Sequence, residues 1–84
     1  MVRIVYLARL RDAFGTPAEQ VELPRDVGTV AMLLAWLTAR GGVWARELAS
    51  GRAVRVAVNH DLAQLTTEIG SDDEVALFPP VTGG

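Results

Sequence analysis

The last six residues of the chain could support chemistry. Pro79-Pro80-Val81-Thr82-Gly83-Gly84 places two prolines before two glycines. Consecutive prolines hold the backbone in an extended, polyproline-like conformation. Glycines carry no Cβ, so the end of this tail is thin enough to enter a narrow cleft of another protein. There it would present the carboxylate of Gly84.

A carboxylate at the end of a chain is a weak nucleophile and a poor electrophile, but ATP can activate it. Attack on the α-phosphate gives an acyl-adenylate, and a sulfur donor that displaces AMP leaves a thiocarboxylate. That group is anionic at neutral pH and is a good sulfur nucleophile. The route needs only Gly84. The alternative is an inert, frayed terminus, which is common at chain ends.

The rest of the chain offers little competing chemistry. It has no cysteine, and all eight basic residues are arginine, which excludes thiolate and Schiff-base chemistry. His60 is the one histidine, and we interpret it as an exposed turn residue rather than a general base. Asp72-Asp73-Glu74 is interpreted as a solvated acidic turn rather than a cation site. We therefore expect no metal and no bound cofactor.

The chain of 84 residues predicts one domain over residues 1–84, with residues 79–84 as an extended tail. Half of the residues are hydrophobic and 21% are charged, as in ordinary globular proteins. No apolar run approaches the roughly 18–20 residues of a membrane span. The N-terminus enters a strand-like pattern without a signal peptide, so we expect a cytoplasmic location. A net charge of −2 argues against a nucleic-acid surface.

The first half of the chain predicts two strands, a helical turn and a helix. In residues 2–10, Val2, Ile4 and Tyr6 alternate with their neighbours, which predicts a strand with these three side chains inward. Residues 9–17 favour a short helical turn ended by Gly15 and Pro17, and residues 19–23 favour a second strand closed by Pro24. Thr29 is the expected N-cap of a helix with one apolar stripe, stopped by Gly41-Gly42. The stripe is Val30, Leu33, Leu34 and Leu37.

The second half predicts a short helix over residues 44–48 and a third strand over residues 54–58. Asn59-His60-Asp61 forms a turn, residues 62–69 contain at most one very short strand, and residues 70–73 form another turn. Glu74–Phe78 is the last strand, with Val75 and Leu77 inward. Trp36 and Trp44 are expected to pack partly into the core.

This order of elements predicts an α+β fold of the ubiquitin-like β-grasp type, a mixed sheet of 4–5 strands with a crossover helix. The first and last strands would be neighbours at the centre of the sheet. Strand parity then predicts an outward apolar patch beside the tail, suited to binding a partner protein, although scattered surface hydrophobes are the alternative. The patch comprises Val5, Leu7, Ala76 and Phe78, with Leu62 as an extension and Arg11 at the edge.

Three segments resemble the small, sulfur-carrier subunit of molybdopterin synthase. The most specific is residues 73–84, Asp-Glu-Val-Ala-Leu-Phe-Pro-Pro-Val-Thr-Gly-Gly. Residues 5–12 followed by Gly15 resemble the first strand and turn of that family, and Ala57-Val58-Asn59 resembles its central strand. One departure is Asp72, which stands where the family has glycine. Aspartate tolerates a positive φ at some cost, or Gly70 could provide it.

The resemblance implies a mechanism and a set of partners. An E1-like activating enzyme would adenylate Gly84 with ATP, and a sulfur donor protein would convert it to a thiocarboxylate. The tail, Pro79 to Gly84, would then enter the active site of the large subunit, within a heterotetramer. Two sulfur transfers to cyclic pyranopterin monophosphate would build the dithiolene of molybdopterin. The substrate-binding and acid–base residues would belong to the large subunit, so no independent activity is expected of the small one.

Three other functions remain open at this stage. The chain could be a sulfur carrier for another pathway, such as thiamine thiazole synthesis. It could be a ubiquitin-like modifier joined to target lysines through Gly84, although its lack of lysine excludes lysine-linked chains of the protein itself. It could also be a β-grasp interaction domain with an inert tail.

Overall fold

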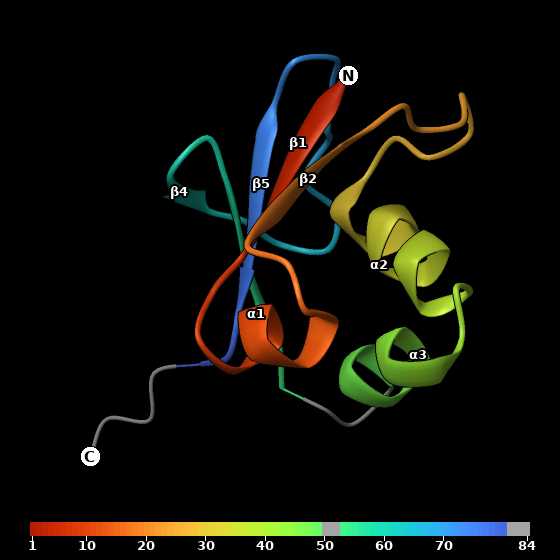
Figure 1. Ribbon diagram of the computed structural model, residues 1–84. Helices are drawn as coiled ribbons and strands as arrows, with labels where there is room; N and C mark the ends of the chain where they lie inside the picture. The colour runs from red at the N-terminus through yellow and green to blue at the C-terminus, as the bar shows by residue number, and fades with distance from the viewer. Residues whose placement is uncertain (50–52, 81–84) are drawn as a thin grey trace.

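The computed structural model describes residues 1–49 and 53–80, which form one mixed five-stranded sheet with three helices (Figure 1). The strand order is β2-β1-β5-β3-β4. This arrangement confirms the expected β-grasp fold. The elements are β1 (Val2–Tyr6), α1 (Arg9–Phe14), β2 (Ala18–Val21), α2 (Val30–Thr38), α3 (Gly42–Leu48), β3 (Arg55–Val58), β4 (Asp61–Leu62) and β5 (Glu74–Phe78).

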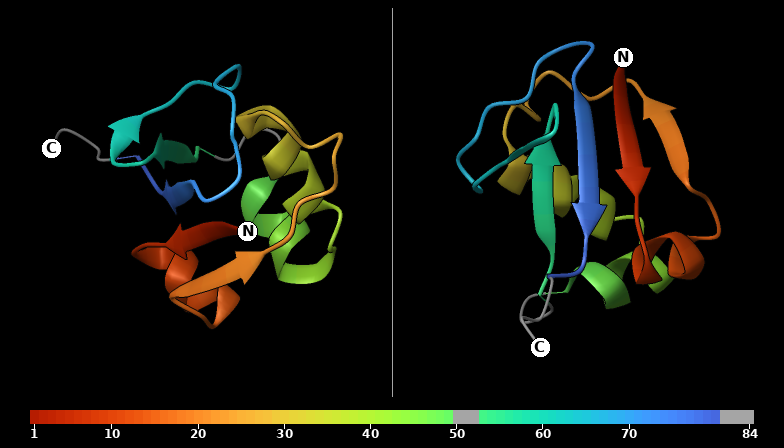
Figure 2. Two further views of the ribbon diagram at one scale, coloured as in Figure 1. Left: turned by 90° about the horizontal axis from the view of Figure 1, so that it is seen from above. Right: turned by 90° about the vertical axis from the view of Figure 1, so that its left-hand side faces the viewer.

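The first and last strands are neighbours, as the sequence predicts. β1 pairs in parallel with β5, with Arg3 opposite Glu74 and Tyr6 opposite Leu77, and pairs antiparallel with β2 on its other side. β3 pairs antiparallel with β5. α2 and α3 cover one face of this sheet, whereas no helix of residues 1–49 and 53–80 covers the other (Figure 2). The tail of the chain therefore starts from a strand that has a partner on both sides.

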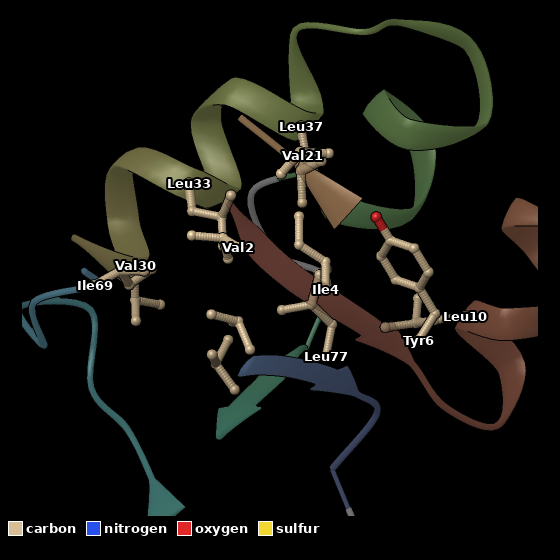
Figure 3. Close-up of a cluster of buried hydrophobic side chains, with 12 residues drawn as sticks. Val2, Ile4, Tyr6, Leu10, Val21, Val30, Leu33, Leu37, Ile69 and Leu77 are labelled. Carbon is tan, nitrogen blue, oxygen red and sulfur yellow. The ribbon is translucent and has the colours of Figure 1, made fainter. Parts of the chain in front are cut away.

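The hydrophobic core lies between the covered face of the sheet and α2 (Figure 3). Alternation along the strands turns one set of side chains toward α2, and Ile4, Tyr6, Val75 and Leu77 are fully buried. α2 contributes the buried residues Val30, Leu33 and Leu37 at helical spacing. Leu34, expected in the same stripe, is only half-buried.

Several boundaries differ from the sequence prediction. β1 ends at Tyr6, α3 begins at Gly42 and β3 begins at Arg55, where the sequence predicted residues 10, 44 and 54. The second strand ends at Val21 rather than residue 23, because β1 begins at Val2, the partner of Val21, and offers no later pairing. α2 ends at Thr38, and Gly41, with φ of 78°, leads directly into α3 instead of only stopping the helix. Asn59 and His60 have φ of 50° and 73°, values typical of a tight type I′ hairpin turn, so Asp61 already belongs to β4.

Asp72 itself adopts the left-handed conformation, with φ of 70°, and Gly70 does not take over that role. The backbone N–H of Asp72 donates to the Met1 carbonyl at 2.9 Å. A carboxylate oxygen of Asp72 lies 3.7 Å from the Met1 ammonium nitrogen. The turn before β5 therefore keeps its geometry without glycine and is tied to the start of β1.

Within the described residues, no helix is long and apolar enough to cross a membrane.

Candidate functional site

The base of the tail lies at one end of the sheet, where β5 emerges between β1 and β3. The N–H of Leu7 donates to the carbonyl of Leu77 at 3.0 Å, and Phe78 pairs with Arg55 on β3. Pro79 and Pro80 follow, and because proline has no N–H, the ladder cannot continue through them. Val81, Thr82, Gly83 and Gly84 lie outside the described residues, so their chemical role remains a prediction.

An apolar row crosses the open face of the sheet near this base. Its residues occupy opposed positions on successive strands, so their side chains share one face. Leu62, at the edge, is 73% exposed, whereas Val5 and Ala76, at the centre, are half-buried. The row runs Ala18, Val5, Ala76, Ala57 and Leu62.

A second, shorter row lies closer to the tail. Leu7 is 43% exposed and comes one residue after the Tyr6–Leu77 pair, which brings it level with half-buried Phe78. Arg55 is opposite Phe78 on β3 and is exposed. Arg11 is exposed on α1, which packs against both β1 and β5. All the residues predicted for partner binding except the edge residue Leu62 therefore lie at or near the tail end of the open face.

The sequence prediction missed Ala18, Ala57 and Arg55. Parity within residues 54–58 could have placed Ala57 and Arg55 outward, because Val56 is buried between them. Their approach to Ala76 and Phe78, however, depends on β3 pairing with β5. That pairing is set by packing of the whole sheet and has no local signal in the sequence.

Asn59 fixes the other end of β5. Its backbone N–H donates to the Glu74 carbonyl at 2.8 Å, and its side-chain oxygen accepts from the Glu74 N–H at 3.0 Å. Its amide nitrogen donates to a carboxylate oxygen of Asp73 at 3.0 Å. Hydrogen bonds to its carboxylate hold the pKa of Asp73 below its ordinary value. The bond from the Gly70 N–H has the largest effect, and the bond from the Asn59 amide the next largest. These bonds link the turn after β3 to the strand that carries the tail.

The most elaborate polar cluster lies on the covered face and is structural. Glu19 accepts from the Tyr6 hydroxyl at 2.7 Å and from both terminal nitrogens of Arg40 at 2.9 and 3.0 Å. The hydrogen bonds from Arg40 lower the pKa of Glu19, whereas burial raises that of Tyr6. The Arg40 guanidinium also lies over the rings of Trp36 and Trp44, and Trp44 stacks on Phe14 at 3.9 Å. Both tryptophans are thus packing residues, as predicted.

The structure supports neither His60 as a general base nor the acidic turn at residues 72–74 as a cation site. The His60 side chain is 86% exposed, and its Nε2 atom lies 3.5 Å from a carboxylate oxygen of Glu74. Among the described residues, no group of three or more acidic, histidine or cysteine side chains could hold a metal ion.

Known proteins are similar to this chain over its whole length, in sequence and in fold. The model of the ThiS family matches residues 4–84. The molybdopterin synthase sulfur carrier subunits of Haemophilus influenzae and Escherichia coli are 36% and 37% identical to the chain, and each alignment covers all of both chains. SAMP1 from Haloferax volcanii has a similar structure, with a TM-score of 0.79 and 26% identity over 99% of this chain and 98% of its own.

A more distant likeness shows the same fold within an assembly. It comes from the complex of subunits 1 and 2 of the molybdopterin-converting factor of Helicobacter pylori, with 20% identity, a TM-score of 0.66, and coverage of 99% of this chain and 97% of that one.

The sheet order, the crossover helix and the central position of the last strand define a ubiquitin-like β-grasp protein. The chain belongs to the ThiS family and, within it, to the molybdopterin synthase sulfur carrier subunits.

Proposed function

We propose that this protein carries sulfur on the carboxylate of Gly84 and donates it during the synthesis of the molybdenum cofactor. The observation that carries this proposal is the junction at Phe78-Pro79-Pro80, where the last strand ends beside an open apolar face. The full-length likeness to molybdopterin synthase sulfur carrier subunits supports it.

The chemistry divides into loading and transfer. In loading, a Gly84 carboxylate oxygen attacks the α-phosphate of ATP and pyrophosphate leaves. A sulfur donor then attacks the acyl carbon of the adenylate and AMP leaves, which yields the thiocarboxylate. In transfer, that sulfur attacks a carbon atom of cyclic pyranopterin monophosphate, and a carbon–oxygen bond of the substrate breaks. Water then cleaves the bond between the Gly84 acyl carbon and the sulfur, which restores the carboxylate and leaves the sulfur on the substrate. Two rounds supply the two sulfurs of the dithiolene.

We propose that the partners supply every other group that the reaction needs. An E1-like enzyme would bind ATP, a separate protein would donate sulfur, and the large subunit of molybdopterin synthase would hold the pterin substrate in a heterotetramer. The open sheet face around Val5, Leu7, Ala76 and Phe78 would dock on these proteins while the tail enters their active sites. The small chain alone would then show no sulfurtransferase activity.

Mass spectrometry of the loaded protein tests this proposal. After incubation with ATP, the activating enzyme and a sulfur source, we expect a gain of about 16 Da, because sulfur replaces one carboxylate oxygen. A Gly84 deletion should gain no mass and support no molybdopterin synthesis, although it should still fold and bind the large subunit. Molybdopterin synthesis by the deletion variant would contradict the mechanism.

A second candidate function is protein modification. The structural likeness to SAMP1, a small archaeal modifier protein, favours it over an inert interaction domain. In that case the activated Gly84 would form amide bonds with target lysines. The same experiment, run with cell extract, would show adducts heavier by the mass of the chain instead of the gain of about 16 Da.

A further inference from the structure

The charged side chains are distributed unevenly between the two ends of the molecule. The tail end contains α1, α3 and the start of β3 (Figures 1 and 2), and in the described residues it carries four guanidinium groups against the carboxylates of Asp12 and Glu47. We call these four residues the arginine rim. The arginine rim comprises Arg9, Arg11, Arg46 and Arg55.

The opposite end of the sheet, where β1 and β5 begin, is acidic. Its cations are Arg3, Arg25 and the Met1 ammonium group. They are outnumbered by the carboxylates of Glu22, Asp26, Asp61, Asp72, Asp73 and Glu74. Within the described residues, a protein with a net charge of −2 therefore presents a positive end, and this is the end at which β5 finishes (Figure 2).

The arginine rim is partly held in place and partly free to interact. Glu47, only 7% exposed, has a carboxylate oxygen 3.5 Å from a guanidinium nitrogen of Arg9, and this pair ties α1 to α3. Its other carboxylate oxygen lies 3.5 Å from the Nε atom of Arg46, within α3. Arg11 and Arg55 are exposed and have no ion-pair partner within residues 1–49 and 53–80. Arg55 also lies opposite Phe78, two residues before Pro80. Two uncompensated charges thus border the base of the tail.

We infer that the proteins that receive the tail carry acidic side chains around the mouth of the receiving cleft, and that the arginine rim steers the carrier toward them tail first. This inference rests on the proposed function, because it assumes that the tail enters a partner. A partner with an acidic mouth would repel the acidic end of the carrier and attract the rim, which favours the productive orientation. Exposed charges act over about 8 Å at physiological salt, so the effect should appear mainly in the association rate.

Association kinetics with the large subunit from the same genome test the inference. At low salt, Arg55→Glu should slow association by about tenfold, and the deficit should shrink as salt rises, because screening removes the steering. Arg11→Glu should show the same pattern. The matched control is Arg25→Glu, which changes the charge equally at the acidic end and should alter the association rate by less than about twofold. Circular dichroism melting verifies that each variant is folded.

The outcomes separate this inference from the proposed function. Suppose that the wild-type protein gains sulfur and binds the large subunit, but Arg55→Glu associates as fast as Arg25→Glu or faster. The inference of acidic side chains around the receiving cleft is then wrong, and the proposed sulfur transfer is unaffected. An effect confined to the dissociation rate and insensitive to salt would also overturn steering, because it would mark Arg55 as a short-range contact only. If the wild-type protein neither gains sulfur nor binds, the proposed function fails and the steering inference fails with it.

Discussion

At the scale of single residues, Asp72 shows how this chain forms a turn with a left-handed residue other than glycine. Its φ of 70° is costly for a residue with a Cβ, and aspartate is among the side chains that tolerate it best. The hydrogen bond to the Met1 carbonyl and the nearby ammonium group help to offset that cost. These contacts therefore stabilise the turn that leads into β5.

Substitutions at Asp72 should separate backbone strain from side-chain interactions. Asp72→Ala should lower the free energy of unfolding by about 1 kcal/mol, because alanine tolerates the left-handed conformation poorly. Asp72→Gly should change it by less than about 0.5 kcal/mol, because glycine removes the strain. Urea unfolding measures both values. Equal destabilisation by alanine and glycine would show instead that the carboxylate, not the backbone, decides stability at this turn.

At the scale of elements, the sequence was sufficient for the strands and helices that carry strong periodicity. Val2, Ile4 and Tyr6 alternate, and apolar residues of α2 recur at helical spacing, so periodicity alone identifies both elements. The structure buries Val2, Ile4 and Tyr6, and all of the stripe except Leu34. The end of β2 and the position of β4 depend on which residues of the neighbouring strand lie opposite. The local sequence does not encode this pairing. For the same reason, parity could place Ala57 and Arg55 outward, but only the pairing of β3 with β5 shows that they lie beside Ala76 and Phe78.

The contact between β2 and the end of α2 should make stability depend on pH. Arg40 donates to both carboxylate oxygens of Glu19 and thereby lowers its pKa in the folded state. A carboxyl group with a lowered folded pKa stabilises the protein above its unfolded pKa, about 4.5, and this contribution is lost as the pH falls through the folded value.

Glu19→Gln should therefore lower the free energy of unfolding by about 1 kcal/mol at pH 7 and by much less at pH 3. Urea unfolding at both pH values measures the difference. The control is Glu22→Gln, an exposed carboxylate just beyond β2, which should have little effect at either pH. A loss for Glu19→Gln that is equally large at pH 3 would contradict the role assigned to the ionised carboxylate.

At the scale of the whole molecule, the covered face of the sheet supports the fold and the open face is available for partners. Leu7 and Leu65 are both large apolar residues on the surface, 43% and 59% exposed. Leu7 lies beside Phe78 at the tail end, whereas Leu65 lies in the connection between β4 and β5, where its carbonyl accepts from the Ala31 N–H. The two leucines therefore offer a matched test of the open face.

Leu7→Ser should weaken binding to the large subunit by about tenfold or more, because burying a leucine side chain contributes about 1.5–3 kcal/mol. Leu65→Ser should leave the affinity within about twofold. Calorimetric titration measures the affinity, and thermal unfolding verifies that both variants retain the fold. Equal losses at the two positions would show that docking does not use the open face.

The parallel pairing of β1 with β5 also has a mechanical consequence. β5 runs toward the tail with β1 on one side and β3 on the other, so tension applied through Pro79 acts along the strand axis. Such tension loads the hydrogen bonds of both ladders in shear, and they must yield together rather than open one after another from an end. A partner that grips the tail and then withdraws can therefore pull on this small domain without peeling its last strand from the sheet.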